Sequence, residues 1–135
     1  MPSSRTRRGA AAQPAPEEDD AVRADDEVTT CASVGLPASA RVLFAVVNAN
    51  GTLIRGLGVA TANRLSTGMY QVIFDQDVSA AGYVGTVGLA GSAGVAPIGD
   101  ISVAGRTGIP NGVFVETFAS DGTAADRPFH LAVLA

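Results

Sequence analysis

The chain has no lysine and no tryptophan, and its 135 residues include one cysteine and one histidine. Because Cys31 is the only cysteine, no disulfide bond can form within the chain. One histidine and one cysteine are also too few for a transition-metal site, which takes several nitrogen or sulfur ligands. The sequence therefore predicts neither a bound metal nor a cofactor.

Large side chains are scarce as well. All seven aromatic residues lie after position 43, and the apolar content consists mainly of alanine, valine and glycine. Small side chains remove little surface from water, and burial is worth roughly 25 cal/mol per Å² of apolar area. A core of this kind in a domain of about 100 residues is only marginally stable alone. Association would bury more surface, so we expect a homo-oligomer.

The charge distribution argues against nucleic acid as a partner. All nine basic residues are arginine, a bias that together with the alanine and glycine content is typical of GC-rich, actinobacterial genomes. The net charge is −4, and from Cys31 onward six acidic residues face five arginines. Without a basic patch, binding to a phosphate backbone is not expected.

No apolar run is long enough to span a bilayer. Arg7-Arg8 resembles the start of a twin-arginine signal, but the apolar segment that follows is too short. We therefore expect no conventional signal peptide, and a protein that is cytoplasmic or carried in a larger particle.

The composition changes near residue 37. Residues 1–37 are poor in large apolar groups and rich in proline and charge, so they cannot offset the entropy of ordering. They are predicted to form a disordered, flexible tail, with one or two helical turns around Pro16 to Ala24. Residues 38–135 are predicted to form one domain.

The densest apolar stripe of that domain lies within Arg64 to Asp75. A turn at Ser66-Thr67-Gly68 leads into a strand that places Tyr70, Val72 and Phe74 on one face. We expect the other strands to pack around this one.

Further strands are predicted where apolar runs lie between turn signals: Arg41–Asn48, Thr52–Ala60, Gly82–Ala90, Asp100–Ala104, Val113–Ala119 and Phe129–Leu134. The first is apolar almost without break, as in a strand covered on both faces. Residues 61–66 are expected to lead into the central strand, and Gly56 and Gly58 suggest a bulge or a close backbone approach. About eight short strands without helical periodicity predict an all-β fold, an antiparallel, jelly-roll-like β-sandwich.

No catalytic constellation is evident, so an enzyme is not expected. His130 lies in the last strand, and Ser66, Ser79, Ser92, Ser102 and Ser120 have no nucleophile elbow around them. Asp75-Gln76-Asp77 resembles half of a calcium site, which would need further oxygens from Asp100, Asp121 or Asp126. Such a pair is common in loops, and no metal or catalytic residue is assigned.

Glycine recurs with period three at Gly82, Gly85, Gly88, Gly91 and Gly94. A phosphate-binding loop would need a following Gly-Lys-Ser/Thr, and a collagen helix would need far more proline. We interpret these glycines as making room for neighbouring segments or for another subunit.

Four blocks of the sequence resemble an uncharacterised bacterial family of C-terminal β-domains attached to phage-tail-like or surface proteins: residues 46–56, 68–74, 111–117 and 128–133. The stretch Gly68-x-Tyr70-x-Val72-x-Phe74 is also similar to a strand of the C1q/tumour-necrosis-factor jelly rolls, and this resemblance implies a trimer. Neither resemblance implies catalytic residues.

Two hypotheses of function follow. The first is a non-enzymatic structural or adhesive head that self-associates as a trimer. The second is a module that binds carbohydrate or another cell-surface ligand through the loops at Gly91–Gly99 and Gly105–Gly112.

Overall fold

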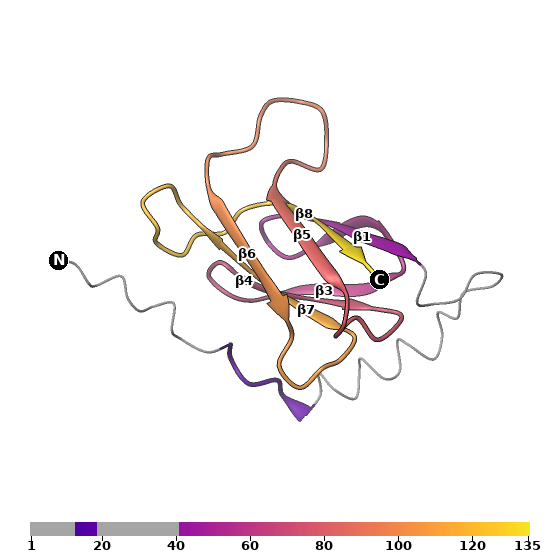
Figure 1. Ribbon diagram of the computed structural model, residues 1–135. Helices are drawn as coiled ribbons and strands as arrows, with labels where there is room; N and C mark the ends of the chain where they lie inside the picture. The colour runs from indigo at the N-terminus through magenta and orange to yellow at the C-terminus, as the bar shows by residue number, and fades with distance from the viewer. Residues whose placement is uncertain (1–12, 19–40) are drawn as a thin grey trace.

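The computed structural model describes residues 13–18 and 41–135, and the second range folds into two packed antiparallel sheets (Figure 1). This confirms the predicted all-β sandwich. The eight strands are β1 (Val42–Val47), β2 (Leu53–Leu57), β3 (Val59–Ser66), β4 (Met69–Phe74), β5 (Gly82–Val87), β6 (Asp100–Gly105), β7 (Gly112–Phe118) and β8 (Phe129–Leu134).

Sheet A has the strand order β2-β1-β8-β5, and sheet B has the order β3-β4-β7-β6. The first strand pairs with the last in sheet A, and β4 pairs with β7 in sheet B. This nested pairing of strands that are distant in sequence is of the jelly-roll kind. The backbone N–H of Ala135 donates to the Arg41 carbonyl, so hydrogen bonding between the two ends of the domain continues to the last residue.

The predicted central strand is confirmed as β4. Tyr70, Val72 and Phe74 are fully buried on its inner face, where they pack against the inner residues of β8 and β1. The ring of Tyr70 meets that of Phe129 edge-on, with the centroids 5.0 Å apart, and so joins the two sheets. Edge-on aromatic pairs of this kind add to the stabilisation that burial provides.

The single strand predicted over Thr52–Ala60 is wrong. The chain forms β2, passes through Gly58 in a left-handed conformation (φ 70°), and crosses to the other sheet as β3. Residues 61–66, expected to be a connection, therefore belong to a strand. Glycine adopts positive φ without steric cost, which lets the chain change sheets in a single residue.

The expected close approach at Gly56 is present. A Cβ at this position would overlap the carbonyl oxygen of Phe44 on β1 and the side chain of Val59. Only glycine lets the backbone of β2 lie this close to its neighbours.

Most of the predicted tail, including Cys31, lies outside the described residues. The same holds for most of the helical turns expected around Pro16 to Ala24. Residues 13–18 are described, and they contact the loop between β6 and β7 through the side chain of Gln13. In the described ranges, no helix is both long enough and apolar enough to cross a membrane.

Candidate self-association surface

The acidic residues considered as calcium ligands do not converge. Asp75 forms an ion pair with Arg41, whereas the carboxylate of Asp77 accepts hydrogen bonds from the backbone N–H and hydroxyl of Ser79. These bonds lower the pKa of Asp77. Asp121 makes the same kind of turn with Thr123, which likewise lowers its pKa. Within residues 13–18 and 41–135, no three His, Cys, Asp or Glu side chains gather as a metal site would require.

Asp126 has a structural position instead. Its carboxylate accepts hydrogen bonds from Nε of Arg64 and from the backbone N–H of Gly68. The hydroxyl of Tyr70 lies 3.4 Å from this carboxylate and donates its proton to the carbonyl of Ala49 at 2.6 Å. Burial opposes the charged form of Asp126, but the bonds from Gly68 and Arg64 outweigh it and lower its pKa. Burial, followed by the charge of Asp126, raises the pKa of Tyr70. This cluster fixes the turn before β4 against the loop before β8.

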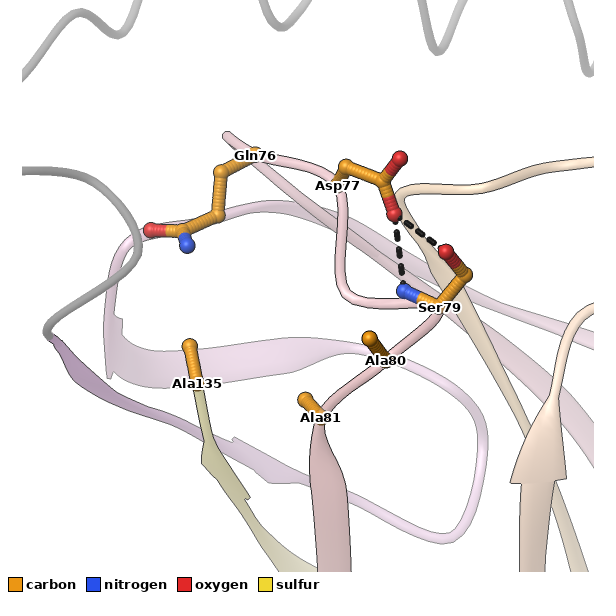
Figure 2. Close-up of a pocket in the computed structure, with 6 residues that line it drawn as sticks. All are labelled: Gln76, Asp77, Ser79, Ala80, Ala81 and Ala135. Carbon is orange, nitrogen blue, oxygen red and sulfur yellow. Dashed lines mark hydrogen bonds between the residues drawn. The ribbon is translucent and has the colours of Figure 1, made fainter.

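One pocket, of about 340 Å³, lies between the β4–β5 loop and the C-terminus. Gln76, Asp77, Ser79, Ala80, Ala81 and Ala135 line it. Figure 2 shows the Asp77 and Ser79 side chains turned toward each other, with the three alanines below them. The backbone N–H and the hydroxyl of Ser79 both donate to the same oxygen of Asp77, so the two side chains close a local turn at the rim of this pocket.

The two loops of the ligand-binding hypothesis lie far apart. The loop that contains Gly91–Gly99 joins the upper end of β6 in Figure 1, and the loop between Gly105 and Gly112 leaves its lower end. A single binding surface made from both loops is therefore not formed.

The feature that stands out is the outer face of sheet A, defined here by six apolar residues on four adjacent strands: Val42, Phe44, Leu57, Val84, Ala132 and Leu134. Strand register places Phe44, Ala132 and Val84 side by side in one row, with Leu57 beyond Phe44 on β2. Val42 and Leu134 lie in the next row, opposite Gly82. Val42, Val84 and Leu134 are each more than half exposed.

These residues correct the expectation that β1 is covered on both faces. Leu43 and Ala45 point into the sandwich and are fully buried, whereas Val42 and Phe44 on the other face are 60% and 37% exposed. The sequence pattern of β1 did show apolar residues on both faces. It could not show that nothing in residues 13–18 or 41–135 covers the second one.

The middle of the third row of the sheet is covered at the start of the β5–β6 loop, whereas Arg55 and Thr86 at its two ends are exposed. In this row, Arg55 and His130 flank Val46 on either side. The Arg55 guanidinium donates to the carbonyl of Ala90, and Nε2 of His130 donates to that of Leu89 at 2.9 Å. Val46 is consequently only 2% exposed. His130, the one histidine, thus holds a loop in place.

The glycines of the period-three run serve different purposes. Gly82 lies beside the outer rows, and no atom lies within 4 Å of the point where its Cβ would stand. No side chain therefore projects from this corner of the face. Gly85 points inward, where a Cβ would lie 3.1 Å from Ile101 and Val103. It therefore makes room for the facing sheet rather than for a partner.

The outer face of sheet B differs, because its large apolar side chains are covered. Ile73 and Phe114 on that face are 2% and 7% exposed. Ile109 from the β6–β7 loop packs on Ile73, and the Arg106 guanidinium lies 5.9 Å from the ring centroid of Phe114. Of the two sheets, only sheet A leaves apolar rows open among the described residues.

Comparison of the chain with protein-family profiles, with curated proteins and with solved structures gives no match.

Proposed function

We propose that this protein is a non-enzymatic structural or adhesive head whose copies associate through the outer face of sheet A. The observation that carries the proposal is the run of exposed apolar side chains across β2, β1, β8 and β5, without a charged residue in its two open rows. A contiguous apolar patch on a soluble domain marks an interaction surface. The resemblance of the stretch Gly68–Phe74 to a strand of the C1q-like jelly rolls favours a trimer.

A second copy of the chain fits this face better than a lipid surface does. Apolar faces that bind anionic membranes are flanked by lysine and arginine. Here the nearest cation on the face, Arg55, donates to a loop carbonyl, and the whole chain carries a net charge of −4. The domain itself is close to neutral, so identical copies do not repel one another strongly.

Light scattering after size exclusion, on the full chain, tests the proposal. The expected mass is three times the 13.5 kDa of the chain. Val84→Glu places a charge on the edge strand β5, in the same row as Phe44 and Ala132, at a side chain that is 59% exposed, so it should dissociate the assembly without unfolding the domain. Leu134→Glu, at 51% exposure, provides a second variant in the next row.

The matched control is Val95→Glu. Val95 is 89% exposed, but it lies in the β5–β6 loop and not on the sheet. This variant should keep the mass of the wild-type protein. A wild-type chain that stays monomeric, or a Val95→Glu chain that dissociates as readily as Val84→Glu, would overturn the proposal.

A further inference from the structure

Residues Gln13–Pro16 contact the domain at a site that contains a buried arginine and is separate from the outer face of sheet A. At its centre is Arg106, which follows β6 and is only 4% exposed. Nε of Arg106 donates to Oε1 of Gln71 at 2.6 Å, which fixes the guanidinium on sheet B. Its Nη1 group donates outward, to the carbonyl of Pro14 at 2.6 Å and to Oε1 of Gln13 at 3.2 Å.

The amide of Gln13 is recognised at both ends. Its Nε2 donates to the carbonyl of Gly105 at 2.7 Å, and its Oε1 also accepts from the backbone N–H of Thr107 at 2.8 Å. These partners are backbone groups at the end of β6 and in the loop that follows it, so their positions are set by the fold. A glutamate could not donate to the carbonyl of Gly105. An alanine would remove the hydrogen bonds that the Gln13 amide makes with Gly105, Arg106 and Thr107. The site therefore selects a primary amide.

The proline that follows is accommodated by a glycine. Cγ of Pro16 lies 3.1 Å from the point where a Cβ of Gly108 would stand, and Gly108 has a φ of 79°. Between the two prolines, Ala15 is exposed and Pro16 is half-buried. In this Gln-Pro-x-Pro segment the side-chain contacts thus fall on the first and fourth positions, whereas Pro14 is exposed and is bound through its carbonyl, and the third position is open to solvent. Proline restricts the free peptide to extended conformations and lowers the entropic cost of binding.

We propose that the Arg106 site, formed by Gln71, Gly105, Arg106, Thr107 and Gly108, is a peptide-binding site for an extended Gln-Pro-x-Pro segment, which a second copy of the chain can supply. The 22 residues 19–40 separate the segment from β1, and a chain of that length can span at most about 75 Å. A domain of about 100 residues has a radius of gyration of only about 13 Å. The Gln13–Pro16 segment of one copy can therefore reach the Arg106 site of another and link the two.

Fluorescence anisotropy with a labelled peptide of residues 11–20 tests this proposal directly. The receptor is the full chain carrying Gln13→Ala. This substitution weakens the binding of the chain's own segment and leaves the residues of the Arg106 site unchanged. Saturable binding is expected. The wild-type chain should bind the peptide at least tenfold more weakly, because its own segment competes at a high effective concentration.

Specificity is tested on the peptide, so that no receptor variant has to fold with an altered buried arginine. A peptide with Gln13→Ala should bind at least tenfold more weakly than the unaltered peptide, whereas one with Ala15→Ser should bind equally well. Equal binding of the Gln13→Ala and unaltered peptides, or no saturable binding of either, overturns the proposal. Peptide binding is measured per site, so the result is separate from the mass measurement that tests association through sheet A.

Discussion

Arg41 and Asp75 form an ion pair with 3.0 Å between Nη1 and Oδ1, and their side chains are only 11% and 5% exposed. Arg41 precedes the first strand of sheet A, and Asp75 follows β4 in sheet B, so the pair joins the two sheets at one end. The same Nη1 group also donates to Oε1 of Gln76 at 3.3 Å. Part of the loop that resembles a calcium site is thus used for structure.

Removing one partner of this pair should destabilise the domain. Arg41→Met leaves the carboxylate of Asp75 largely buried without its cation, and such losses cost about 3–5 kcal/mol. Urea unfolding of Arg41→Met, Asp75→Asn and the double variant would measure the coupling in a double-mutant cycle. Losses that simply add would show that the two side chains do not interact.

Gly56→Ala should be destabilising by about 1–3 kcal/mol, as expected when a methyl group is forced into a packed site. The added Cβ would overlap the carbonyl of Phe44. Gly91→Ala is the matched control, since no atom lies within 4 Å of the Cβ it would add. If thermal unfolding shows the same change for both variants, β2 does not approach β1 as described.

Acid should weaken the fold through Asp126. Because its folded pKa is lowered, its contribution to stability is present above the unfolded pKa of about 3.9 and is lost as pH falls through the folded pKa. The free energy of unfolding in urea should therefore fall less between about pH 6 and about pH 3 for Asp126→Asn than for the wild-type chain. Asp77 and Asp121 act in the same direction, so the pH dependence should be reduced and not abolished. An unchanged difference would contradict this role of Asp126.

Tyr70 and Tyr83 should ionise at a higher pH in the folded chain than in the unfolded chain. Burial raises the pKa of both Tyr70 and Tyr83 above 10.0, aided by the charges of Asp126 and Asp77 respectively. Stability is then fully present below the unfolded pKa and is lost as pH rises through the folded values. Phenolate absorbance should appear above the pH at which the urea-unfolded chain ionises. Coincident titrations of the folded and unfolded chains would contradict the burial of both hydroxyl groups.

Association through an apolar face should respond to salts in a characteristic way. Sodium chloride screens charge pairs and should leave the assembly intact, whereas ammonium sulfate strengthens apolar burial and should favour it. Light scattering across both salts provides the measurement. Dissociation in moderate sodium chloride would indicate an interface held by charges instead.

The sequence predicted most strands because their signals are local. Period-two stripes identified β4, β7 and β8, and the Asn50-Gly51 turn identified the first hairpin. β3 was missed because Gly58 interrupts the chain and the residues after it alternate weakly. A change of sheet at one glycine depends on which strands are available to pair, and no local pattern records that.

Local chemistry and the period of apolar residues determined the fold class and the central strand. Only the tertiary structure decided which apolar faces are covered. Arg106 and Ile109 come from a loop distant in sequence from Ile73, yet that loop covers sheet B. Loop β5–β6 covers only the row of Val46 in sheet A. No described segment covers Val42, Val84 and Leu134, whereas Gln13 meets Arg106 from a distant part of the chain. Both outcomes depend on where distant segments lie in space, which side-chain periodicity cannot encode.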